Sequence, residues 1–130
     1  MNEKLFELAK NGGIIKLGLL VGKGTDLSAT DDAGKTALMY AAENDRYKEA
    51  GLLADKSDIN VTDNTGKTAL MYACENGSYR VVGVLFGLKK ALDSLAADSS
   101  EKTALDYAQA NGDIKTLKAF EVLTERFRPN

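Results

Sequence analysis

Cysteine and histidine limit the catalytic chemistry open to this chain, which has one cysteine, Cys74, and no histidine. A nucleophilic thiol or hydroxyl is normally activated by a neighbouring base, and a thiolate metal site needs further ligands. Cys-His and Ser-His catalysis are therefore excluded. A closely similar stretch has Ala42 in the same place, and free cysteines are commonly buried. We predict that Cys74 is a core thiol.

Carboxylates are numerous, but nothing in their pattern selects a catalytic pair. They fall at equivalent points of a repeated pattern, as residues on a solvated face do: Asp31, Asp32, Glu43, Asp63 and Glu75. General acid/base chemistry is possible in principle, but the arrangement does not point to it. We expect no catalytic residue, no metal site and no cofactor, and we predict that the protein is not an enzyme.

The segment from Gly18 to Thr25 resembles a phosphate-binding loop. That motif has four residues between its glycines and places Ser or Thr directly after the lysine. Here three residues separate Gly18 from Gly22, and Gly24 follows Lys23. The backbone amides would be misplaced for phosphate, so a helix end followed by a loop is the better interpretation.

The composition indicates one ordinary globular domain. The chain has 130 residues, 44% hydrophobic and 28% charged, with a net charge of -2. Nucleic-acid binding needs a basic stripe, so it is disfavoured. The longest apolar stretches, such as 81–88, are too short for a membrane span. A single cysteine and the lack of a signal-like leader lead us to expect a cytoplasmic protein.

The chain is a tandem repeat. The stretch 34–44, Gly-Lys-Thr-Ala-Leu-Met-Tyr-Ala-Ala-Glu-Asn, returns almost unchanged at 66–76 and in degenerate form at 101–111. Thr36, Thr68 and Thr103 lie 32 and then 35 residues apart. Intervals of this size are typical of supersecondary units that stack on their neighbours.

Each unit is predicted to contain a turn and two helices. Asp31 to Gly34 and Asp63 to Gly66 suit tight turns at hairpin tips. The threonine that follows suits a helix N-cap. Leu38, Ala41 and Ala42 recur at helical spacing, and Asn-Gly pairs close most first helices. Asp45 replaces that glycine in one unit and should strain the cap.

A second helix follows each cap. Its apolar residues recur at helical spacing in every unit: Ile14, Leu17 and Leu20; Leu52 and Leu53; Val81, Val82 and Leu85; Ile114, Leu117 and Phe120. The last helix is predicted to run through Leu123 toward Phe127 until Pro129. The connection 89–99 holds two or three extra residues, so we expect an irregular loop there.

The turn, the Gly-x-Thr start, the Asn-Gly closure and the paired aliphatic residues are together similar to the ankyrin repeat, across nearly the whole chain. The resemblance implies an all-α solenoid of stacked antiparallel helix pairs with projecting hairpins and a concave binding surface. We expect one domain, 1–130, with units of about 1–29, 30–61, 62–96 and 97–128.

The chain departs from the family pattern at two positions. Thr-Ala-Leu-Met or Thr-Ala-Leu-Asp stands where the family usually has Thr-Pro-Leu-His. The inter-repeat network of the family histidine therefore cannot form, and alanine at the first helical position should lower stability slightly.

The function that the resemblance implies is non-catalytic binding of a protein partner, in a scaffold role, by a chain that we expect to be a monomer. The family's contact positions map onto the hairpin tips and inner-helix ends, and a tyrosine ladder joins them as core or as contact surface. These candidates are Asp32, Ala33, Lys35, Tyr40, Glu43, Asn64, Thr65, Lys67, Tyr72, Glu75, Ser99, Ser100, Lys102 and Gln109.

A second hypothesis is a structural spacer or a terminal piece of a longer array. The Thr-Ala-Leu-Met motif resembles that of ankyrin arrays of unicellular eukaryotes, some of which are attached to kinase domains. An exposed apolar end near Phe120, Leu123 and Phe127 would favour this hypothesis, because capping units normally turn a polar face outward.

Overall fold

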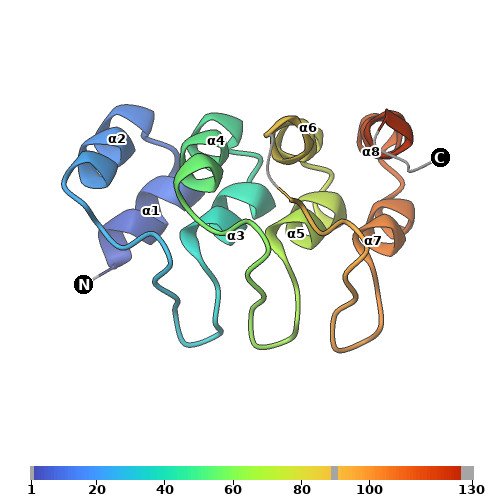
Figure 1. The fold of residues 1–130 in the computed structure, drawn as a ribbon, viewed down its shortest axis with the longest axis horizontal. Coiled ribbons are helices and arrows are strands. Elements are labelled where there is room, and N and C mark those ends of the chain that lie inside the picture. The colour runs from blue at the N-terminus through green and yellow to red at the C-terminus, as the bar shows by residue number, and fades with distance from the viewer. Residues whose placement is uncertain (1, 89–90, 127–130) are drawn as a thin grey trace.

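The computed structural model describes residues 2–88 and 91–126, with side chains described up to Val122. Within these residues the chain forms eight helices in four consecutive pairs: α1 (Glu3–Asn11) with α2 (Ile14–Gly22), α3 (Ala37–Glu43) with α4 (Tyr47–Lys56), α5 (Ala69–Glu75) with α6 (Tyr79–Gly87), and α7 (Ala104–Asn111) with α8 (Ile114–Arg126). The first helices of the pairs form an inner row, the second helices form an outer row, and the loops project beside the inner row (Figure 1). The all-α solenoid is confirmed.

Threonine starts three of the inner helices, as predicted. The hydroxyl oxygens of Thr36, Thr68 and Thr103 each accept a hydrogen bond from the backbone N–H three residues later, at 3.3 Å. These bonds satisfy amides that the first helical turn leaves unpaired. The same threonine N-cap therefore sets where α3, α5 and α7 begin.

Small side chains let the inner helices lie close together. Ala41, Ala42, Ala73 and Cys74 are completely buried. Replacing any of them by a larger residue would push neighbouring helices apart, because protein interiors are close-packed. Cys74 is a free core thiol, as predicted, and burial raises its pKa to about 12.

Each hairpin is closed by its aspartate and by a residue with a positive φ. The N–H of Gly34 donates to the carbonyl of Asp31 at 2.9 Å, and the N–H of Gly66 donates to that of Asp63 at 3.0 Å. The extended arms are not regular strands: among the described residues the only ladder is an isolated bridge between Ala97 and Thr103. The hairpins are therefore turns with short arms.

Adjacent hairpins are hydrogen-bonded to one another at their tips. The backbone N–H of Asn64 donates to the carbonyl of Ala33 at 3.0 Å, and that of Ser99 donates to the carbonyl of Thr65 at 2.8 Å. The Asn64 side chain adds a bond to the carbonyl of Asp32 at 2.9 Å. The row of tips is thus fixed by the backbone of the chain.

The cap at Asp45 is strained, as predicted. Its φ of 53° lies in the left-handed region, where the corresponding Gly77 and Gly112 have φ of 67° and 76°. The Asp45 side chain has a use there, because Oδ1 accepts the N–H of Val81 in the next unit at 3.3 Å and Oδ2 lies 3.5 Å from Arg80.

The segment 91–97 has no helix and is irregular, as expected. Asn60 clamps it, donating to the carbonyl of Ala91 at 2.7 Å and accepting the N–H of Asp93 at 2.8 Å. Phe120 is buried, and its ring forms a T-shaped pair with that of Phe86. The Leu123 side chain and Phe127 lie outside the described residues. None of the described helices combines the length and the apolar character that a transmembrane span requires.

Candidate protein-interaction surface

Lysines and tyrosines alternate in a column along the inner-helix face. The Lys35 ammonium lies 4.2 Å from the ring centre of Tyr40 in its own unit and 4.6 Å from that of Tyr72 in the next. Lys67 repeats the arrangement, 4.3 Å from Tyr72 and 4.7 Å from Tyr107. Each of these lysines therefore joins two units through cation–π contacts. We call these five residues, with Lys10 and Lys102 at the ends, the Lys–Tyr column.

Every tyrosine of the column donates its hydroxyl to the aspartate that opens its own hairpin. The pairs are Tyr40 with Asp31, Tyr72 with Asp63, and Tyr107 with Asp98. These bonds tie each inner helix to its hairpin. They lie within one unit, so they differ from the inter-repeat histidine network that the sequence lacks.

The pairing shifts the pKa of both partners. Burial by itself would raise the pKa of Asp63, but hydrogen bonds from Tyr72, Thr65 and the Lys67 backbone outweigh it, so that pKa is lowered. Burial first, then the bond to Asp63, raises the pKa of Tyr72 far above its ordinary value of 10. Neutral tyrosine paired with ionised aspartate is thus the stable state near neutral pH.

Glutamates neutralise the two middle lysines of the column. Lys35 lies 2.8 Å from Glu43, and Lys67 lies 2.7 Å from Glu75. Both lysine side chains are only 14% exposed. Lys102 is exposed, and Ala110 stands in the last unit where Glu43 and Glu75 stand in the others. The column therefore ends with a cation that lacks this carboxylate.

The hairpin tips are the most accessible of the residues chosen from the sequence. The structure places one group of them in solvent: Asp32, Ala33, Asn64, Thr65, Ser99, Ser100, Lys102, Glu75 and Gln109. Lys35, Tyr40, Glu43 and Lys67 are half-buried, and Tyr72 is 9% exposed. Gln109 takes the place of Cys74 rather than that of Glu75, so it lies apart from the column's acidic partners.

The sequence interpretation missed the three aspartates as structural partners of the tyrosines. Asp31, Asp63 and Asp98 each precede their tyrosine by nine residues. That constant spacing, in a repeat that otherwise varies at its tips, is the signal that could have found them.

Among the described residues, no three His, Cys, Asp or Glu side chains are grouped as metal ligands would be. The segment that resembles a phosphate loop is the end of α2, followed by Lys23 and Gly24 in a turn. The arrangement therefore offers a row of exposed hairpin tips beside the Lys–Tyr column.

A family model described as "Ankyrin repeats (3 copies)" matches residues 5–93. The chain therefore belongs to the ankyrin-repeat family, whose members are generally non-catalytic modules for protein–protein interaction. The match stops before α7 and α8, yet that pair repeats the Thr cap and the Tyr–Asp bond of the others. No curated protein matches the chain closely enough to serve as a relative.

Proposed function

We propose that this protein binds a protein partner across its hairpin tips and the inner-helix face beside them, as a cytoplasmic interaction module. One observation carries the proposal: the tip side chains are exposed while the backbone that presents them is held by bonds between neighbouring hairpins. A pre-ordered surface loses little conformational entropy on binding.

The tips also differ where the rest of the unit is copied. Asp32 and Ala33 correspond to Asn64 and Thr65, and then to Ser99 and Ser100. These side chains are small and, apart from Ala33, polar, which suits a hydrogen-bonding rim more than an apolar anchor. Lys102, Glu75 and Gln109 extend the proposed surface, and the half-buried Lys35, Tyr40, Glu43, Lys67 and the rim of Tyr72 form its floor.

The experiment is affinity capture from the cell of origin, followed by calorimetry with each purified partner. The test variant carries Ala33→Arg, Thr65→Arg and Ser100→Arg, because these positions are exposed and outside the column. The control variant carries Leu95→Arg, Ile114→Arg and Val122→Arg, which add the same charge at exposed sites away from the tips. Lys35 and Lys67 are avoided, since changing them would disturb packing.

We expect the tip variant to lose the partner and the control variant to retain it. Retention by both would reject the tips as the binding surface. Failure of the unmodified protein to bind any partner in calorimetry would favour the structural spacer, alone or beside a kinase. The burial of Phe120 removes one of the exposed apolar residues on which that alternative relied.

A further inference from the structure

The outer helix of the first pair, α2, exposes an apolar face. Ile15 is 80% exposed, Leu19 is 62% exposed and Ile14 is 36% exposed, while Leu17 is the one buried residue of this helix. Ile15, Gly18, Leu19 and Gly22 are spaced by three or four residues, so they share one face. A Cβ added to either glycine would meet no atom within 4 Å. We call these four residues the α2 face.

The other units show that folding does not require an apolar residue at Ile15. The corresponding residues are Lys48, Arg80 and Lys115. Arg80 lies over the rings of Tyr47 and Tyr79, at 5.7 and 5.0 Å, and Lys115 lies 5.0 Å from Tyr79. A cation is therefore compatible with this place in the stack, and only the first unit puts a bulky apolar side chain there in water.

The α2 face lies next to the side of α2 that corresponds to the stacking side of the later outer helices. In each later pair, the residues that correspond to Lys16 and Leu20 are buried, and they are Glu49 and Leu53, Val81 and Leu85, and Thr116 and Phe120. Lys16 is exposed and Leu20 is only half-buried, because no described helix lies on their outer side. The side of α2 that another helix would cover is thus open.

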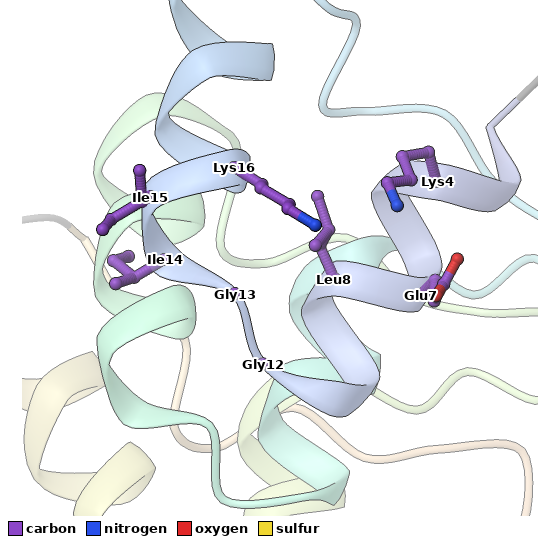
Figure 2. A pocket seen from close by; sticks show the side chains of 8 residues that line it. All are labelled: Lys4, Glu7, Leu8, Gly12, Gly13, Ile14, Ile15 and Lys16. Atoms are coloured by element: carbon purple, nitrogen blue, oxygen red, sulfur yellow. The ribbon is translucent and has the colours of Figure 1, made fainter.

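Beside this face lies an open hollow of about 390 Å³ at the end of the stack. Leu8, Ile14 and Ile15 line it together with Lys4, Glu7 and Lys16 (Figure 2). The hollow does not suit an anion at the start of α2, because the N–H of Gly13 already donates to the Glu49 carboxylate at 3.0 Å. Its walls are apolar, with two lysines and one glutamate at the rim, which suits a side chain from a packed helix.

We propose that the α2 face binds a helix of a partner protein that has an apolar stripe flanked by carboxylates. Lys16 and Lys23 are exposed along one edge of the face, and α2 contains no acidic residue. A second copy of this chain that docked through its own α2 face would bring lysines against lysines, whereas a helix with acidic flanks would pair with them. This inference rests on different residues from the proposed function and stands or falls separately.

The test selects binders from a displayed library of helical peptides with a fixed leucine stripe and flanking positions encoded equally as Lys or Glu. The unmodified protein should enrich Glu over Lys at the flanks by about tenfold. Ile15→Lys and Leu19→Gln should each reduce recovery of the enriched peptides by about tenfold, because both remove apolar area from the face. Ile114→Lys, at an isoleucine that is 66% exposed at the other end, is the matched control and should recover them fully.

Three results would overturn the proposal. They are equal recovery by the Ile15→Lys and unmodified proteins, enrichment without a charge preference, and a dimer by light scattering that becomes a monomer in Ile15→Lys. Urea unfolding of each variant checks that it is folded, and Lys48 and Lys115 show that a lysine fits the place of Ile15. The hairpin-tip variant should select the same peptides as the unmodified protein, which separates this surface from the tips.

Discussion

The hairpins at Gly34 and at Glu101 have similar turns but different residues. Their φ angles are 79° and 64°, so both lie in the left-handed region that favours glycine. A Cβ on Gly34 would lie 2.9 Å from the backbone nitrogen of Asn64, and one on Gly66 would lie 3.1 Å from that of Ser99. Among the described residues no further hairpin follows Glu101. Glycine in the middle hairpins therefore accommodates both the positive φ and the close backbone of the next hairpin. The last hairpin requires only the positive φ.

The Lys–Tyr column shows the same difference. Lys67 lies between two rings and pairs with Glu75, while Lys102 lies 5.8 Å from the one ring of Tyr107. Tyr72 is buried and Tyr107 is half-buried. An identical motif therefore contributes more stability where a neighbour lies on each side, as nearest-neighbour coupling in repeat proteins requires.

Substituting the hairpin glycine should have the largest effect. Gly34→Ala should lower the free energy of unfolding by about 3 kcal/mol, because it adds both backbone strain and a clash with Asn64. Gly112→Ala is the control, since its φ is 76° and no atom lies within 4 Å of an added Cβ. It should cost about 1 kcal/mol, from strain alone. Urea unfolding measures both, and equal costs would show that crowding at Asn64 is unimportant.

Removing the tyrosine hydroxyl should distinguish the middle of the column from its end. Tyr72→Phe leaves the buried Asp63 without one donor and should cost about 2 kcal/mol. Tyr107→Phe should cost about 1 kcal/mol, because Tyr107 is half-buried, so water can replace its hydroxyl as the donor to Asp98 more easily than at Tyr72. Chemical denaturation of the two variants gives the comparison. If Tyr107→Phe cost more stability than Tyr72→Phe, the idea that a second neighbouring unit strengthens the Tyr–Asp bond would be wrong.

Alkaline pH should weaken the same bonds. The bond to Asp31, and then burial, raise the pKa of Tyr40 to about 12, and burial, then the bond to Asp98, raise the pKa of Tyr107 to about 12. The folded state holds these protons more tightly than the unfolded state, whose tyrosines titrate near 10. Stability should be complete below pH 10 and fall as pH rises toward 12. Urea midpoints at pH 8, 9.5 and 11 test this, and Tyr72→Phe should flatten the dependence more than Tyr107→Phe.

Neutralising the lysines should have a smaller effect. Lys67→Met removes two ring contacts and an ion pair and should cost about 1 kcal/mol. Lys102→Met should change stability by less than about 0.5 kcal/mol, because one distant contact is lost. Thermal unfolding at low and high salt checks the pair. A loss for Lys67→Met that disappears entirely in high salt would assign its role to the ion pair alone.

Replacing Glu101 should give the smallest change, in the opposite direction. Glu101→Gly relieves the left-handed strain but adds freedom to the unfolded chain, for a net gain of about 0.5 kcal/mol. Ser100→Gly adds the freedom without relieving such strain, since Ser100 does not have a positive φ. It should therefore destabilise slightly. A loss of stability in Glu101→Gly would mean that the Glu101 side chain makes a favourable contact.

Local signals in the sequence predicted the fold well. Thr36 and its equivalents marked helix starts, the Asp-x-x-Gly turns marked hairpins, and Asp45 marked a strained cap, because each depends on residues within one turn. The position of Lys35 between rings of two units was not predicted, because it depends on how far one unit is offset from the next. The exposure of Ile14 was missed for the same reason: helical spacing groups residues on a face but does not say what covers it.

Because Cys74 is completely buried near the centre of the stack, its reactivity can report on local unfolding of the protein. Only the thiolate reacts with disulfide reagents, and this thiol is both covered and hard to ionise. Labelling of Cys74 then requires that α5 separate from its neighbours. When this opening recloses faster than the reagent reacts, the labelling rate measures the equilibrium for local opening at α5. Because the chain has no second cysteine, mass spectrometry of the labelled protein over time would measure this local opening with and without a bound partner.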